Sequence, residues 1–148
     1  AGLLGPAAGG KDGRGRMSLG MFAAVAAGGA LVAMTRYAVS LGLGAGMFGV
    51  PGPLATLAVN VVGSAMMGIL AGLVAAGIAI PEAWRGFVAV GFLGALTTFS
   101  SFALDTGTLM ARQGLSISIV YVGLSVLLSL VAFLSVQGLV AGFLALAT

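Results

Sequence analysis

Charged residues are missing from two long stretches of this sequence. None occurs in residues 37–81, between Arg36 and Glu82, and none in residues 113–148, after Arg112. Each stretch is longer than one membrane span, for which about 20 apolar residues suffice. Over the whole chain 6% of residues are charged and 60% are hydrophobic, whereas a soluble domain carries about 25% charged residues. The sequence therefore predicts an all-α integral membrane protein, because this composition suits lipid as a solvent and not water.

The spacing of charges, glycines and prolines divides the chain into four expected transmembrane helices. Their ranges are 18–41, 54–78, 82–111 and 115–145, and a Gly- and Pro-rich loop at 42–53 joins the first two. Since all connections are short, consecutive helices are expected to run antiparallel. Residues 17–148 are therefore expected to form one four-helix transmembrane domain.

A short basic tail precedes this domain. Residues 1–16 are rich in Gly, Ala and Arg, have no hydrophobic period and are expected to be disordered. Basic residues beside a first span indicate topology before they indicate a nucleic-acid site, so no nucleic-acid partner is expected. Met17 is a candidate natural start, in which case the tail is an extension.

The composition also argues against an enzyme. The chain has no cysteine and no histidine, and its acidic residues are Asp12, Glu82 and Asp105. Without thiolates, imidazoles or paired carboxylates, the sequence offers neither a nucleophile–base pair nor a metal cluster of acidic and imidazole ligands. A transport or structural role within the membrane is the expectation that remains.

Polar residues inside the expected spans are the functional candidates, because an unpaired polar group is unfavourable in lipid. Arg36 lies near the end of the first helix, Asn60 lies midway along the second, and Tyr121 and Ser125 lie on the fourth. The run 94–102 (GALTTFSSF) gathers hydroxyls, a glycine and two phenylalanines in the middle of the third. Such a run predicts that the third helix is interrupted in mid-membrane, which frees backbone carbonyls to bind a cation. Aromatic ring edges are partially positive, so the phenylalanines are suited to lining an anion path.

Each of these residues also has a simpler structural interpretation. Arg36 alone fits an interfacial anchor, and Asn60 alone fits a hydrogen bond between helices. Serines in membrane helices usually bond the carbonyl four residues back, and pairs of phenylalanines usually face lipid or pack. By default, a structural role is expected for Tyr121, Ser125, Ser129 and Ser135.

Taken together, the stretches resemble the Fluc (CrcB) fluoride channel family. The first helix carries Gly28-Gly29 and ends in Arg36-Tyr37, and the second carries the string TLAVNVVGS at 56–64. The third element is the string GFLGALTTFSSF at 91–102. The order, spacing and four-helix frame cover almost the whole chain from about residue 18, and the TTFSxF string is the most specific part.

The resemblance implies a subunit of a fluoride-selective channel in the inner or plasma membrane. It implies an antiparallel, dual-topology homodimer with two pores and a central Na⁺, which exports cytoplasmic F⁻ passively and protects against fluoride toxicity. By motif position the fluoride pathway would include Asn60, Thr98, Phe99, Ser100, Ser101, Phe102 and Tyr121. Arg36 would lie in the vestibule, and the backbone carbonyls of Gly94 and Thr97 would hold the Na⁺.

The sequence departs from the family pattern at a few positions. Val32, Ala55 and Ala95 stand where glycine is common, and Leu93 replaces a frequent cysteine. Ser101 replaces a threonine but keeps the hydroxyl, while Ala103 and Asp105 stand where the family often has Ser and Glu. Whether the subunit pairs with itself or with a homologous subunit is left open.

Two other functions are open to a chain with this composition. A small four-helix proton-coupled exporter, similar to the small multidrug resistance transporters, would also pair antiparallel, but that family has a glutamate in its first span. Residues 18–41 contain no carboxylate, and with no histidine only Asp105 remains inside a span to carry protons. The second alternative is an accessory subunit whose polar residues only pack helices together.

Overall fold

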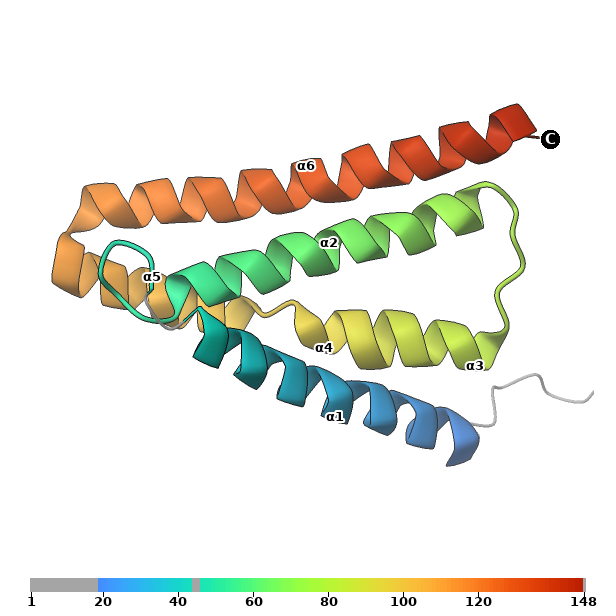
Figure 1. Cartoon of the computed structure of the whole chain (residues 1–148), viewed down its shortest axis with the longest axis horizontal. Coiled ribbons are helices and arrows are strands. Elements are labelled where there is room, and N and C mark those ends of the chain that lie inside the picture. The colour runs from blue at the N-terminus through green and yellow to red at the C-terminus, as the bar shows by residue number, and fades with distance from the viewer. Residues whose placement is uncertain (1–18, 44–45, 148) are drawn as a thin grey trace, which may run out of the picture.

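The computed structural model describes residues 19–43 and 46–147, and all elements in these ranges are helices. The predicted disordered tail, 1–16, lies outside the described residues. Four helical stretches are long and apolar enough to cross a membrane: Leu19–Gly42, Pro53–Ala75, Gly86–Gln113 and Leu115–Leu146. They match the four predicted ranges, and Figure 1 shows that consecutive stretches run in opposite directions, as expected.

The first two helices differ little from their predicted bounds. Helix α1 spans Leu19–Gly42 and α2 spans Pro53–Ala75. Proline is well placed at the start of α2, because the first N–H groups of a helix have no acceptor within the helix and a missing one therefore loses no hydrogen bond. The prediction that this helix continues to Ile78 is wrong, because Gly77 adopts a φ of +79°. The N–H groups of Gly77 and Ile78 donate to the carbonyls of Val74 and Leu73, which is a Schellman motif that ends the helix.

The third stretch consists of four elements. They are α3 (Glu82–Arg85), the π-helix η1 (Gly86–Leu93), α4 (Gly94–Leu96) and α5 (Phe99–Gln113). Between α4 and α5, Thr97 and Thr98 have extended backbone, with ψ of 138° and 116°. We call these two residues the helix break. In η1 the bonds reach back five residues, as from Gly94 N–H to the carbonyl of Ala89.

The last helix returns along the second. Gly114, with φ +87°, reverses the chain after α5, and α6 then runs from Leu115 to Ala147. In Figure 1, α6 lies along α2 in the same direction, while α1 lies along η1. Glycine allows both approaches, since a Cβ on Gly68 would lie 2.5 Å from the carbonyl oxygen of Phe133 on α6.

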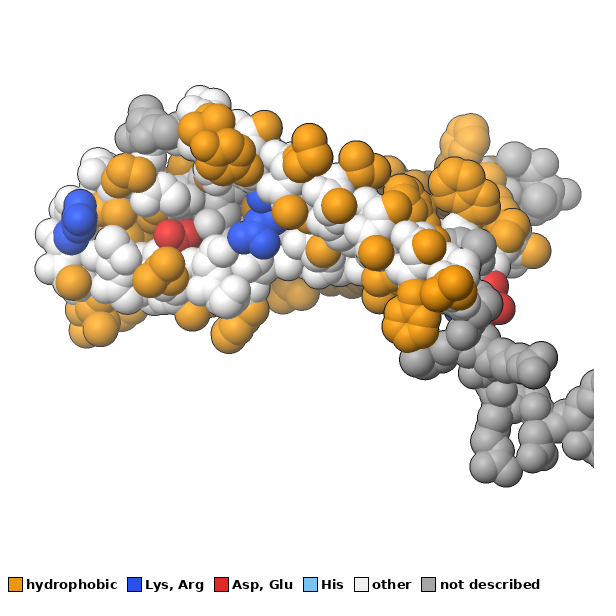
Figure 2. Space-filling model, turned by 90° about the horizontal axis from the view of Figure 1, so that it is seen from below, with side chains coloured by type: hydrophobic (Ala, Val, Ile, Leu, Met, Phe, Trp, Pro, Cys, Tyr) orange, Lys and Arg blue, Asp and Glu red, His pale blue; other side chains and the backbone are white. Residues whose placement is uncertain are grey.

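The core is thin and the surface is apolar. One buried cluster joins Val50, Leu57, Leu109 and Tyr121, and another joins Val32, Val59 and Leu96. Many large hydrophobic side chains are exposed, as expected of helices whose solvent is lipid. Figure 2 shows one face of the molecule on which orange hydrophobic side chains are scattered over most of the length and charged side chains are few.

Candidate functional site

The helix break changes the partners of two backbone carbonyls. In a continuous helix the N–H of Thr98 would donate to Gly94, and that of Ser101 would donate to Thr97. Here Thr98 N–H donates to Asn60 Oδ1 at 2.8 Å, and Ser101 N–H donates to the Thr98 hydroxyl at 3.2 Å. The carbonyls of Gly94 and Thr97 thus lose their usual helical donors, and both residues are exposed.

Carbonyl oxygens of this kind suit a hard cation such as Na⁺. The part of the chain that the structure describes has no group of three or more His, Cys, Asp or Glu side chains. Backbone carbonyls are thus the candidate ligands here, and the sodium ion implied by the sequence motifs stays a prediction.

Asn60 on α2 is clamped to the helix break. Its Oδ1 accepts the N–H of Thr98, and its Nδ2 donates to the carbonyl of the same residue at 3.4 Å. Since the N–H donor identifies the oxygen of the amide, the orientation of the side chain is fixed. The second proton on Nδ2 remains for another acceptor.

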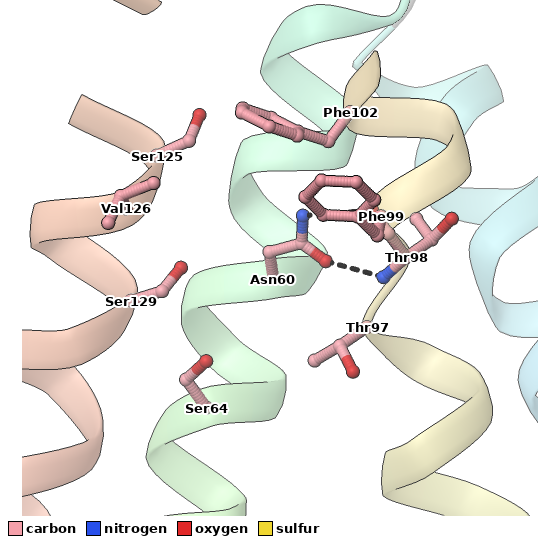
Figure 3. A pocket seen from close by; sticks show the side chains of 9 residues that line it. All are labelled: Asn60, Ser64, Thr97, Thr98, Phe99, Phe102, Ser125, Val126 and Ser129. Atoms are coloured by element: carbon pink, nitrogen blue, oxygen red, sulfur yellow. Dashed lines mark hydrogen bonds between the residues drawn. The ribbon is translucent and has the colours of Figure 1, made fainter. Parts of the chain in front are cut away.

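A groove of about 370 Å³ opens beside this clamp. Figure 3 shows that α2, the helix break with the start of α5, and α6 each contribute side chains to it. We call it the groove, and its lining residues are Asn60, Ser64, Thr97, Thr98, Phe99, Phe102, Ser125, Val126 and Ser129. None of these side chains is charged.

The two serines that α6 contributes have free hydrogen-bonding capacity. The hydroxyl oxygens of Ser125 and Ser129 are buried and have no hydrogen-bond partner within the described residues. The expectation that such serines bond the carbonyl four residues back is therefore wrong for these two, although it holds for Thr35, Ser40 and Thr108. Figure 3 shows both hydroxyls directed across the groove toward the side of Asn60 and the phenylalanines.

The two phenylalanines of the TTFSSF string lie together. The ring centroids of Phe99 and Phe102 are 5.6 Å apart, and the rings are tilted by 45°. The Phe99 side chain is 80% exposed, so one face of its ring is not covered by this chain. Phe99 and Phe102 thus line the groove from the side opposite the serines of α6 (Figure 3).

A second, smaller cavity of about 190 Å³ lies on the other side of Thr98. Arg36 lines it together with Ser101 and Asp105, and Arg36 Nη2 donates to Ser101 Oγ at 2.8 Å. We call it the Arg36 cavity. Thr98 lines both cavities and is only 8% exposed, so it forms part of the wall between them.

Tyr121 lies behind the groove and does not line it. Its side chain is fully buried, its ring centroid is 5.7 Å from that of Phe102, and its hydroxyl donates to Asp105 Oδ2 over 3.5 Å. Tyr121 therefore supports Phe102 from behind, and its predicted place on the fluoride path stays a prediction.

The structure brings most of the predicted site residues together, and it adds others. Asn60, Thr98, Phe99 and Phe102 share the groove, while Ser101 lies in the Arg36 cavity and Ser100 is exposed beside Thr98, with the two hydroxyls 3.3 Å apart. The residues to which sequence reasoning assigned no functional role are Ser64 and Ser129, while Ser125 is a sequence candidate whose default interpretation is structural. A signal was present, because Tyr121, Ser125 and Ser129 are four residues apart and so lie on one helix face.

Comparison with known proteins identifies the family. The model of the family described as "CrcB-like protein, Camphor Resistance (CrcB)" matches residues 23–139. The chain belongs to this family. It is 47% identical over 122 residues to the "Fluoride-specific ion channel FluC" of Rhodospirillum centenum, covering 82% of this chain and 91% of that protein. The proteins of the same name in Nitrobacter winogradskyi and Shewanella amazonensis are 45% and 44% identical, each over 112 residues, covering 76% of this chain and 88% and 86% of theirs.

Family membership and the four apolar helical stretches together make the chain a multi-pass membrane protein. The predicted family is thereby confirmed, and the roles of individual site residues are a separate question.

Proposed function

We propose that this chain is a subunit of a fluoride-selective channel that lets cytoplasmic fluoride leave the cell passively and so protects against fluoride toxicity. The names of the relatives support this function. The observation that carries it in the structure is the groove, which places unpaired hydrogen-bond donors beside two aromatic rings without any charged side chain.

The groove is suited to a small, strongly hydrated anion. Such an ion gives up its water only where donors replace it. Asn60 offers its remaining Nδ2 proton, and Ser125 and Ser129 offer hydroxyl protons with no other acceptor among the described residues. The edges of Phe99 and Phe102 add partial positive charge without fixed charge. The absence of a cation from the lining favours passage, since an ion held too tightly is not released.

The proposed channel is an antiparallel, dual-topology homodimer in the cell's inner or plasma membrane. Support comes from the openness of the site: Phe99 is 80% exposed, and one chain encloses too little space for a sealed pore. A second copy, or a homologous subunit in the opposite orientation, would close each groove and give two pores. Native mass spectrometry of the purified protein should give a dimer, and a monomer that conducts fluoride would contradict this assembly.

In that dimer the proposed role of the helix break is to bind a cation. The break would lie in mid-membrane, and the carbonyls of Gly94 and Thr97 would hold the Na⁺ there. A cation there raises the local potential for an anion in both pores. The chain's own part is to present these carbonyls by diverting the N–H groups of Thr98 and Ser101 to Asn60 and Thr98.

Passive flow is enough for export. Hydrogen fluoride enters the cell from an acidic exterior as a neutral molecule and dissociates inside, and the membrane potential drives the trapped anion out. Such a channel catalyses no reaction, in keeping with the expectation that the chain is not an enzyme. The proton-coupled alternative needs a carboxylate in the first span, and Leu19–Gly42 contains none. No observation favours that alternative.

Expression in a bacterium that lacks its own fluoride exporter tests this function in cells. The chain should restore growth in fluoride at a concentration that stops the host, while equal chloride should have no effect on either strain. If the protein is present in the membrane and growth in fluoride is not restored, the function is contradicted.

A further inference from the structure

Arg36 reaches from α1 to the start of α5, although the two residues joined are 65 positions apart in the chain. Its Nη2 donates to Ser101 Oγ at 2.8 Å, a charge-assisted hydrogen bond that ties the guanidinium to the start of α5. A residue with only an electrostatic role in a vestibule needs no such bond. The hydrogen bonds that Ser101 makes to other residues therefore bear on the role of Arg36.

Ser101 is also bonded to Thr98. Ser101 Oγ also accepts from the Thr98 hydroxyl at 3.1 Å, so with the Arg36 bond both of its lone pairs are engaged. The Thr98 oxygen in turn accepts the backbone N–H of Ser101 at 3.2 Å and lies 3.3 Å from Ser100 Oγ. Because the one Thr98 proton is given to Ser101, Ser100 is the donor in the last bond.

Thr98 connects Ser101 to the groove. Its side chain is bonded on the side of the Arg36 cavity, while its backbone N–H and carbonyl are held by the amide of Asn60. Because Thr98 is bonded on both sides and is only 8% exposed, a displacement of Ser101 also displaces Asn60. The sequence of bonds is Arg36 to Ser101, Ser101 to Thr98, and Thr98 to Asn60.

We infer that Arg36 is a positioning residue for the groove, acting through the hydroxyls of Ser101 and Thr98 to hold Asn60 and the helix break in their conducting geometry. This rests on the proposed fluoride channel function and adds to it. Arg36 does not line the groove, so it affects conduction through Ser101. We therefore expect it to set the maximal rate of ion passage and not the affinity with which the channel binds the ion.

A double-mutant cycle tests the inference, with fluoride efflux from liposomes as the readout. The variants are Arg36→Gln, Ser101→Ala and the two combined, measured over a range of fluoride concentrations. Each single change should lower the maximal flux about tenfold, because each removes the partly buried, charge-assisted bond between Arg36 and Ser101. The combined variant should be no slower than either single variant, since both changes break the same connection. Ser101→Thr keeps the hydroxyl and should retain flux near that of the unaltered chain.

Other results overturn the inference. If the two effects multiply, or if the Arg36→Gln defect disappears at saturating fluoride, Arg36 acts by gathering anions and not by positioning. Arg112→Gln, which removes an exposed cation at the end of α5, controls for net charge and should leave flux unchanged. If Arg36→Gln fails to fold, the pair Ser101→Ala and Ser101→Thr decides, because full flux in Ser101→Ala contradicts the inference.

The unaltered chain separates this test from the test of function. No fluoride flux from the unaltered protein contradicts the channel itself. Flux from the unaltered protein with independent mutant effects contradicts only the role of Arg36.

Discussion

Asn60 and Thr98 form a reciprocal pair in which the side-chain amide of one residue bonds both backbone groups of the other. Thr98 N–H donates to Asn60 Oδ1 at 2.8 Å, and Asn60 Nδ2 donates to the Thr98 carbonyl at 3.4 Å. The pair joins the second membrane stretch to the helix break in the third. It satisfies backbone groups that lose their helical partners there, and it orients the amide toward the groove. The same residue thus stabilises the break and supplies a donor beside it.

Asn60→Asp should abolish most of the flux while leaving the fold intact. A carboxylate has nearly the same shape and still accepts the N–H of Thr98, but it cannot donate and brings negative charge into the groove. Repulsion of an anion at low dielectric is worth several kcal/mol, so flux should fall by about 100-fold or more. Fluoride efflux from liposomes measures the loss, and size-exclusion chromatography verifies the fold. Flux within threefold of the unaltered protein would exclude Asn60 from the path.

Ser129→Ala should separate conduction from stability. The hydroxyl of Ser129 is buried without a hydrogen-bond partner in the described part of the chain, so removing it should leave thermal stability unchanged or slightly raised. Flux should fall about tenfold, because one donor to the dehydrated ion is lost. Ser135→Ala is the matched control, since Ser135 is exposed on the same helix and lies outside the groove. A stability loss with unchanged flux would show that the serine only packs helices.

Phe99→Ile should lower flux far more than an equivalent change elsewhere on the surface. Phe99 and Phe143 are similarly exposed, at 80% and 73%, but only Phe99 lines the groove. Isoleucine keeps the hydrophobic character and removes the partially positive ring edge. Efflux should therefore be strongly reduced in Phe99→Ile and normal in Phe143→Ile. Equal flux in the two variants would mean that Phe99 simply faces lipid.

Gly28→Ala should destabilise the protein by about 1–3 kcal/mol, because the added methyl meets backbone that is unable to move aside easily. A Cβ at Gly28 would lie 2.9 Å from the backbone atoms Gly91 C and Phe87 O, so α1 and η1 would have to separate. Gly29→Ala is the control, since its nearest contact is 3.9 Å away. Thermal unfolding followed by chromatography in detergent compares the two. Equal unfolding temperatures would show that this helix contact is looser than described.

The sequence was sufficient to predict the spans, because missing charge and hydrophobic length are local properties. The end of α2 was predicted three residues late, although glycine is the residue that most often adopts a positive φ at the end of a helix, so Gly77 was an available signal. The π-helix η1 also went unforeseen, because its hydrophobic residues read equally well as an ordinary helix. Nothing in residue order predicts that Arg36 bonds Ser101, because that contact depends on how α1 lies against the third stretch.

The candidate site was predicted from motifs more completely than from single residues. The motifs predict that Asn60, Phe99 and Phe102 belong to one pathway, and the structure places all three side chains in one groove. The sequence favours a structural role for the serines of α6, because a serine in a membrane helix usually bonds its own backbone. Their position facing Asn60 depends on how α6 packs against α2, which sequence spacing alone does not set.

The measurement that tests the central claim most directly is ion efflux from liposomes that contain only the purified protein. The liposomes are loaded with fluoride or chloride, efflux is started by a potassium ionophore without a proton gradient, and each ion is followed with its own electrode. The account predicts rapid fluoride efflux and chloride efflux no greater than from protein-free liposomes. No fluoride efflux, or chloride efflux at the same rate as fluoride, would contradict it.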